Sequence, residues 1–410
     1  AGAWCGQNKY LSAIKNAFQN FMPLTIAGAI GVLWCNVLVN EQTGLGLFFK
    51  PIMALDFLNP AFQAVNFCTI SCITVGITLG IAQEIGVWNM GAERAGYIPG
   101  LVGLAAWLSV TNTSHMVEGA KEAFTGIAGN ELGATGLFTG MIIGVLSVEL
   151  FCFFEKQDAL KIKMPEQVPP GVARAFEVLV PATITLIITA CIGSACYNLT
   201  GLYLNDVIKN GIQGPLGAVG ATIPGVMIIY LVIMLFWLVG IHGNNMLSAV
   251  KEALFTPLAL ENVEKFNKGE KPTNIINMYA LQMWGEFGGS GVTIGLVIAI
   301  MIFGKREDNK AIATLSLVPG LFNINETVTF GIPMVLNPIL GIPFVVAPLI
   351  TIIIGYVLTV IGFCPVACLT VPWTTPPIVF GFLACGANVM GAVTQAILIV
   401  VSTVIYVPFL

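Results

Sequence analysis

Long apolar runs are the feature that most constrains how this chain can fold. A helix needs about 20 mostly apolar residues to cross a bilayer, and a spanning segment must satisfy its own backbone hydrogen bonds. A membrane β-barrel would instead show alternating segments of about ten residues. The runs extend approximately from Phe21 to Val39, Ala61 to Ala82, Ile98 to Val110, Gly133 to Phe154, Val178 to Leu199, Ala221 to Val239, Gly288 to Phe303, Phe344 to Phe363 and Asn388 to Pro408.

The composition supports a membrane protein. Of the 410 residues, 9% are charged and 56% are hydrophobic, and the mean hydropathy is +0.88, whereas roughly 25% of a soluble domain is charged. With 17 basic and 21 acidic residues, the chain lacks the excess of positive charge that is typical of nucleic-acid-binding proteins. We therefore predict an all-α polytopic membrane protein with roughly eight to ten transmembrane helices plus two re-entrant hairpins.

Basic residues indicate the orientation of the chain. They cluster before the first run and after the second and fourth, whereas the alternate loops are poor in them: Lys9, Lys15, Arg94, Lys156, Lys161, Lys163 and Arg174. The positive-inside rule then predicts a cytoplasmic N-terminus. Glu84 and Glu93 flank Arg94, and we expect pairing between them at the surface.

A polar, glycine-rich segment divides the chain. We predict an N-terminal transmembrane scaffold and dimerisation domain at 1–200, an amphipathic connector at 201–219 and a C-terminal transport domain at 220–410. Basic clusters around Lys268 and Lys305 would both be cytoplasmic, which one intervening pass cannot satisfy. The segment between them makes two passes, re-enters from one side, or breaks the positive-inside rule.

Polar breaks interrupt the C-terminal apolar runs. They are Gly240-Ile-His-Gly-Asn-Asn245, Asn323-Ile-Asn-Glu326 and Pro372-Trp-Thr-Thr-Pro-Pro377. Irregular backbone at membrane depth persists only where it is buried in protein or lines a cavity. Paired breaks of this kind are typical of the binding site of a transporter.

Glu326 and His242 are the candidate catalytic residues. Glu326 has no cation in its local sequence, and an ionisable group at membrane depth costs several kcal/mol unless it is paired or wetted. A neutral imidazole both donates and accepts, which suits a hydroxyl ligand. The competing interpretations are a structural carboxylate that caps a hairpin helix and a satisfied core histidine.

The candidate substrate-binding residues lie beside these two. Amides and a hydroxyl supply directional hydrogen bonds to sugar hydroxyls, and tryptophans can stack on a sugar ring, although a tryptophan of the interfacial belt is the competing interpretation. Glu286 is ambiguous, and a structural role is favoured. The predicted binding set is Trp237, Gly243, Asn244, Asn323, Asn325, Trp373 and Thr374.

Several signatures are missing from the sequence. It contains no glycine-rich phosphate loop ending in Lys-Ser/Thr, no Asp pair for magnesium and no His-Glu-x-x-His helix. Ten cysteines and two histidines do not follow zinc spacing. We expect neither a cofactor nor a metal.

Long motifs around these residues resemble a known family. Gly240-Ile-His-Gly243, the stretch from Phe322 to Glu326 that continues from Phe330 to Pro338, and Val371-Pro-Trp-Thr-Thr-Pro-Pro377 are similar to the IIC component of the bacterial phosphotransferase system, in its lactose/cellobiose/diacetylchitobiose branch. The resemblance covers nearly the whole chain. One departure is Thr327, where the family usually has proline.

The resemblance implies a function and a set of partners. The fold would be like that of the glucose-superfamily IIC proteins, in the bacterial plasma membrane, and the protein would be a homodimer surrounded by lipid. A β-linked disaccharide (cellobiose, diacetylchitobiose or lactose) would cross, and a phosphocysteine-bearing IIB protein, supplied through IIA, HPr and enzyme I, would phosphorylate its 6-hydroxyl. In the family, the residues matching Glu326 and His242 bind that hydroxyl, and those matching Trp237 and Trp373 lie near the sugar. The permease would contribute to phosphotransfer only together with IIB.

Two other hypotheses remain at this point. In an ion- or proton-coupled disaccharide symporter, Glu326 and His242 would form a proton relay. An intramembrane enzyme acting on a lipid-linked sugar is the third possibility.

Overall fold

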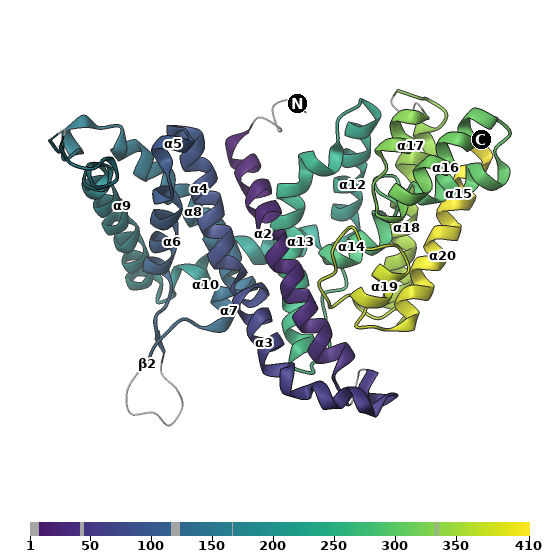
Figure 1. The fold of residues 1–410 in the computed structure, drawn as a ribbon, viewed down its shortest axis with the longest axis horizontal. Helices are drawn as coiled ribbons and strands as arrows, with labels where there is room; N and C mark the ends of the chain where they lie inside the picture. The colour runs from purple at the N-terminus through teal and green to yellow at the C-terminus, as the bar shows by residue number, and fades with distance from the viewer. Residues whose placement is uncertain (1–7, 42–44, 116–123, 166, 333, 335) are drawn as a thin grey trace. The chain divides into compact units, whose positions relative to one another are not determined.

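The computed structural model describes residues 8–41, 45–115, 124–165, 167–332, 334 and 336–410. These residues are mainly helical, and they form two compact units (Figure 1). The first unit consists of the described residues up to Leu24 together with Cys68–Leu216. The second unit consists of Thr25–Phe67 together with Gly217–Leu410. Residues 25–67 thus pack with the C-terminal residues. The roles predicted from the sequence, namely scaffold, connector and transport domain, stay predictions.

The first unit contains the beginning of α2 (Lys9–Leu33) and a group of membrane-length helices joined by short elements. These elements are η4 (Ile70–Cys72), α4 (Ile73–Met90), α5 (Ala92–Ala95), α6 (Ile98–Val110), β1 (Ser114–His115), β2 (Phe124–Thr125), α7 (Gly129–Leu132), α8 (Ala134–Glu155), η5 (Asp158–Leu160), α9 (Pro170–Thr200), α10 (Leu204–Ile208), η6 (Lys209–Gln213) and the start of α11 (Gly214–Gly220). The two strands pair antiparallel.

Small residues hold α4, α6 and α8 together. A Cβ added at Gly140 of α8 would lie 2.2 Å from the Thr78 hydroxyl of α4, and one at Gly103 of α6 would lie 2.3 Å from Ala82 of α4. Glycine at such contacts lets helix backbones approach closely, which is how helices associate in lipid, where apolar burial gives little advantage. Trp107 fills the space that α6 leaves beside α8 and is completely buried.

The second unit carries the remaining elements. They are η1 (Trp34–Leu38), η2 (Leu45–Leu47), η3 (Lys50–Leu58), α3 (Asn59–Cys68), α12 (Ile223–Leu238), α13 (Gly243–Asn267), α14 (Met278–Gly285), α15 (Ile294–Phe303), α16 (Glu307–Leu321), α17 (Glu326–Gly331), α18 (Gly341–Val360), α19 (Val379–Ala384), α20 (Val389–Tyr406) and η7 (Val407–Phe409).

Polar side chains of α20 satisfy the irregular backbone inside the second unit. Ser402 donates to the carbonyl of Val292 at 2.9 Å, and Tyr406 donates to that of Gly291 at 2.7 Å. Gln395 donates to the carbonyl of Met283 and accepts from two backbone amides at the start of α19. These bonds replace the water that unpaired carbonyls would require, so a non-helical loop can be buried among apolar helices.

The helix lengths confirm a polytopic helical membrane protein. Six helical stretches of the described chain are long and apolar enough to cross a membrane: Lys9–Leu38, Lys50–Met90, Ala134–Glu155, Pro170–Thr200, Gly341–Val360 and Val389–Phe409. Three shorter apolar helices, Ile98–Val110, Ile223–Leu238 and Ile294–Phe303, add to them. The re-entry of hairpins into the membrane stays a prediction.

Several predicted runs have different bounds in the structure, and two of them show why. The run expected from Phe21 begins as a helix at Lys9, because the polar turns before it continue the same helix. The run expected from Gly288 becomes helical only at Ile294. Gly288, Gly289 and Gly291 adopt φ of 71°, 90° and 82°, which an α-helix cannot contain.

Candidate functional site

His242 stands at the start of α13, where the first sequence break occurs. It is the N-cap residue, and its Nδ1 accepts a hydrogen bond from the backbone N–H of Asn245 at 3.2 Å. The next residue must be glycine, because a Cβ at Gly243 would lie 2.0 Å from the carbonyl oxygen of Ile233 on α12. Because Nδ1 accepts, the neutral imidazole carries its proton on Nε2. His242 therefore presents a donor on its other side.

Glu326 faces that donor. It is the first residue of α17, and its Oε1 lies 3.7 Å from Nε2 of His242, with side chains 47% and 36% exposed. This separation is too long for a direct hydrogen bond. An oxygen about 2.8 Å from each atom would complete a triangle with them, as an O–H donor to the carboxylate and an acceptor from the imidazole. The pair is thus arranged to hold one hydroxyl with its hydrogen toward Glu326.

Thr327 occupies the first turn of the same helix. The N–H groups of a first helical turn have no partner within the helix, so proline and threonine both fit there. The departure from the pattern of the family is therefore compatible with the position of Glu326.

Asn323 connects three segments of the second unit. Its Oδ1 accepts from the backbone N–H of Gly288 at 2.6 Å, and its Nδ2 donates to the carbonyls of Trp373 and Thr375. It adopts φ of 62°, a left-handed conformation that asparagine tolerates. Its amide is occupied by these contacts, so in this structure Asn323 supports the site rather than facing a ligand.

The two predicted tryptophans differ in exposure. Trp373 is 44% exposed and Thr374 beside it is also exposed, so both are accessible to a ligand. Trp237 is only 2% exposed. Its ring lies 4.4 Å from the His242 ring and 6.4 Å from the ring of Phe344. Trp237 thus packs against the imidazole and limits its rotation, and its contact with a sugar stays a prediction.

Asn244 and Asn325 meet at the glycine loop between α14 and α15. Asn244 donates to the hydroxyl of Ser290 at 2.9 Å, and Asn325 donates to the carbonyl of Ser290 at 2.8 Å. A Cβ at Gly289 would lie 2.7 Å from the Asn325 side chain, so glycine is required for this approach. The residues next to His242 and Glu326 are therefore joined through one loop.

A buried ion pair contacts the side chain of Asn244. Lys251 donates to Asn244 Oδ1 at 3.2 Å and forms an ion pair with Glu286, with side chains only 7% and 16% exposed. Tyr230, completely buried, donates to Glu286 at 2.6 Å. This geometry agrees with a structural role for Glu286.

Sequence reasoning missed Lys251 and Tyr230 as members of this group. The available signal was that Lys251 follows Asn244 by seven residues, which places both on one helix face.

No metal centre is found in the described part of the chain. No group of three or more His, Cys, Asp or Glu side chains there could hold an ion.

Comparison with known families identifies the architecture that carries this site. The family model "Phosphotransferase system, EIIC" matches residues 15–348, which include His242 and Glu326. The chain belongs to this EIIC family. It is therefore a permease component of the phosphotransferase system. The alternatives of a proton-coupled symporter and of an intramembrane enzyme gain no support from this result.

Related EIIC proteins match over almost the full chain. The oligo-beta-mannoside-specific EIIC component of Bacillus subtilis (strain 168) is 33% identical, over 98% of this chain and 89% of the relative. The lactose-specific EIICB component of Staphylococcus aureus (strain COL) is 32% identical, over 98% of this chain and 69% of the relative. The crystal structure of ChbC, the IIC component from the N,N'-diacetylchitobiose-specific phosphotransferase system, superposes with a TM-score of 0.90 at 29% identity, covering 99% of this chain and 94% of that one.

Proposed function

We propose that this EIIC component carries a β-linked disaccharide or short oligosaccharide and presents its 6-hydroxyl for phosphorylation by a IIB protein. The observation that carries the proposal is the distance of 3.7 Å between Nε2 of His242 and Oε1 of Glu326, which suits one shared hydroxyl. Both side chains are partly exposed, so a sugar can reach them.

The geometry supports a division of roles within the pair. Glu326 accepts the proton of the hydroxyl as its oxygen attacks phosphorus, the P–S bond to the IIB cysteine breaks, and the cysteine leaves as a thiolate. His242 donates to the attacking oxygen and keeps it oriented. Phosphoryl transfer depends mainly on positioning and on management of charge, so a base and one donor are an adequate contribution from the permease.

The names of the relatives support the sugar class. They specify oligo-β-mannoside, lactose and N,N'-diacetylchitobiose, whose common chemistry is a β-linkage between pyranose rings. The exposed face of Trp373 offers an apolar surface for one such ring. Thr374 supplies a hydroxyl beside it.

The phosphoryl donor is proposed to be a separate protein. The lactose-specific relative is an EIICB component, and this chain matches 69% of it, so a B part belongs to that protein. We propose a phosphorylated IIB partner for this chain, itself phosphorylated through IIA, HPr and enzyme I. The homodimer and the cytoplasmic N-terminus remain predictions, supported by the family resemblance and by the distribution of basic residues respectively.

Coupled uptake tests the proposed function. In proteoliposomes holding the purified chain, radiolabelled β-disaccharide should accumulate inside only as sugar phosphate, and only with phosphorylated IIB present in the lumen. Unphosphorylated IIB is the control and should allow equilibration without accumulation. Concentration of unmodified sugar driven by a proton gradient alone would refute the proposal.

Trp373→Ala should weaken binding of the disaccharide about tenfold, because an aromatic contact contributes about 0.5–1.5 kcal/mol in addition to its buried area. Equilibrium binding of radiolabelled sugar to the purified protein measures the effect. Trp88→Ala is the matched control, since Trp88 is 58% exposed and lies on α4 of the other unit. Equal losses in the two variants would show that Trp373 has no specific contact with the sugar.

A further inference from the structure

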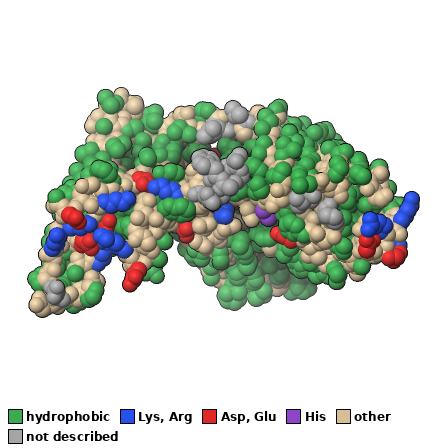
Figure 2. Space-filling view, turned by 90° about the horizontal axis from the view of Figure 1, so that it is seen from above, with side chains coloured by type: hydrophobic (Ala, Val, Ile, Leu, Met, Phe, Trp, Pro, Cys, Tyr) green, Lys and Arg blue, Asp and Glu red, His purple; other side chains and the backbone are tan. Residues whose placement is uncertain are grey.

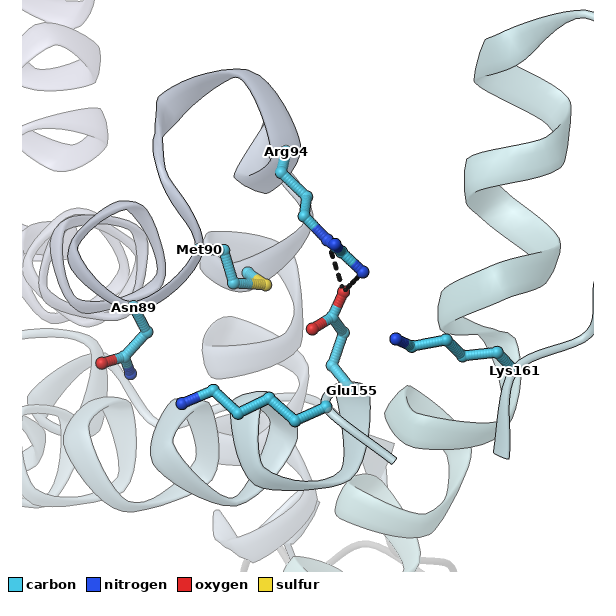
Figure 3. A pocket seen from close by; sticks show the side chains of 6 residues that line it. Asn89, Met90, Arg94, Glu155 and Lys161 are labelled. Atoms are coloured by element: carbon cyan, nitrogen blue, oxygen red, sulfur yellow. Dashed lines mark hydrogen bonds and ion pairs between the residues drawn. The ribbon is translucent and has the colours of Figure 1, made fainter. Parts of the chain in front are cut away.

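A small charged pocket lies at one end of the helices of the first unit. Asn89, Met90, Arg94, Glu155, Lys156 and Lys161 line a volume of about 260 Å³. Figure 3 shows Arg94 and Lys161 extending toward Glu155 from different segments of the chain. Sites for drug-sized ligands begin at roughly 300 Å³, so this pocket suits a small polar group.

The charges around the pocket leave one cation in excess. Glu155 is 3% exposed, and its carboxylate accepts from Arg94 at 2.9 Å and from Arg174 at 2.9 Å. Both guanidinium groups also bind Glu177, so these four side chains balance one another. The pairing of Arg94 with Glu84 and Glu93 expected from the sequence is wrong, because the acidic partners come from α8 and α9.

The lysines of the pocket are available for a ligand. Lys161, whose side chain is 11% exposed, lines the pocket and pairs with Asp158, whose side chain is 82% exposed and can turn away into solvent when a ligand takes its place. The ammonium group of Lys156 forms no ion pair within the described parts of the chain. A singly charged anion in the pocket would therefore neutralise Lys156 without displacing the carboxylate of Glu155.

The position of the pocket indicates the source of the anion. One candidate membrane span ends at Met90, another ends at Glu155, and a third begins at Pro170. Outward-facing apolar side chains flank these ends, with Phe153 59% and Trp88 58% exposed. Figure 2 shows a mixed group of basic and acidic side chains at the left of this face, bordered by hydrophobic surface. The ends of membrane-spanning helices lie near the headgroup region of a bilayer, which is where lipid phosphates are found.

We propose that this pocket binds a phosphate-bearing anion, namely the phosphate headgroup of an anionic phospholipid at the boundary of the membrane. Basic pockets between membrane helices recognise lipid head groups in this way, and each lysine near the surface contributes a binding free energy that corresponds to about fivefold in affinity. The ligand joins the ends of α4 and α8 to the connector that precedes α9. This proposal is independent of the sugar site.

Lipid titration of the purified full chain tests the proposal. Native mass spectrometry would follow binding of a short-chain phosphatidylglycerol, with phosphatidylcholine of the same chain length and inorganic phosphate as separate arms. We expect phosphatidylglycerol to bind saturably and more tightly than phosphatidylcholine. Inorganic phosphate at the same concentration should not displace it. Equal binding of the two lipids would overturn the proposal, and displacement by inorganic phosphate would overturn the lipid as the source of the anion.

Variants of the connector locate the site. Lys156→Gln should weaken phosphatidylglycerol binding about fivefold, and Lys156→Gln combined with Lys161→Gln about 25-fold. Lys163→Gln is the matched control, since Lys163 is exposed on the same connector but does not line the pocket; it should stay within about twofold of the wild type. Equal effects of Lys156→Gln and Lys163→Gln would show diffuse attraction to charge and overturn the pocket.

Discussion

Glu326→Gln is expected to lower the rate of sugar phosphorylation by at least about a hundredfold while disaccharide affinity changes only a few-fold. A positioned general base contributes about 10²–10⁴ in rate, and the amide can still accept a hydrogen bond but cannot take the proton. Single-turnover transfer of labelled phosphate from phosphorylated IIB to saturating sugar measures the chemical step, and equilibrium binding measures the affinity.

A matched substitution separates the base from a general effect of removing charge. Glu307 has a side chain 85% exposed and pairs with Lys310 at the surface of the same unit. Glu307→Gln should therefore leave both rate and affinity unchanged. Phosphorylation at the wild-type rate in Glu326→Gln would refute the base role of Glu326. Loss of binding as large as the loss of rate would instead show that Glu326 only binds the sugar.

Lys251→Met is expected to destabilise the protein by about 3 kcal/mol or more, because removing one partner of a buried ion pair leaves the other charge uncompensated. Glu286 would retain only the hydrogen bond from Tyr230 in an interior where its side chain is 16% exposed. Thermal unfolding of the purified protein measures the loss. Lys268→Met is the control, since its ion pair with Glu264 is 60% and 44% exposed and should contribute less than about 1 kcal/mol.

A double variant distinguishes stability from positioning. Lys251→Met combined with Glu286→Gln removes both charges and should recover most of the stability. Asn244 would still lack its donor from Lys251, so sugar affinity should remain below that of the wild type. Full recovery of both quantities would show that the pair stabilises the fold without positioning the site. A loss of less than 1 kcal/mol in Lys251→Met alone would contradict the importance of the buried pair.

Much of the fold could be predicted because lipid imposes simple rules. The long apolar runs became α8, α18 and α20 with bounds close to those expected, and α9 with an earlier start at Pro170, since a helix is the way to satisfy the backbone of an apolar span. The polar breaks became helix starts and turns, because polar side chains can satisfy the backbone groups that a helix end leaves unpaired, as His242 does for Asn245. Glu326 and His242 could be selected because ionisable groups are rare in such surroundings.

The supporting contacts could not be predicted, because their partners are distant in sequence. Asn323 binds backbone groups about Gly288 and Trp373, 35 and 50 residues away, and nothing local in the sequence indicates which amide will be used internally. Lys251 was hidden for a different reason. In α13 it stands directly before Glu252, a local acidic residue, whereas its actual partner Glu286 lies 35 residues away.

The attachment of Asn323 to both loops has a thermodynamic consequence for transport. Asn323 lies three residues before Glu326 and donates to the carbonyls of Trp373 and Thr375, so the proposed sugar contacts are joined within the second unit. A carrier that leaves its sugar chemically unchanged can only equilibrate the two concentrations, because binding by itself supplies no free energy that favours one side of the membrane. Accumulation against a concentration gradient must then come from conversion of the sugar into sugar phosphate, which the permease does not carry back out. The permease is in that sense a facilitator, and the free energy of accumulation is that of the phosphoryl bond.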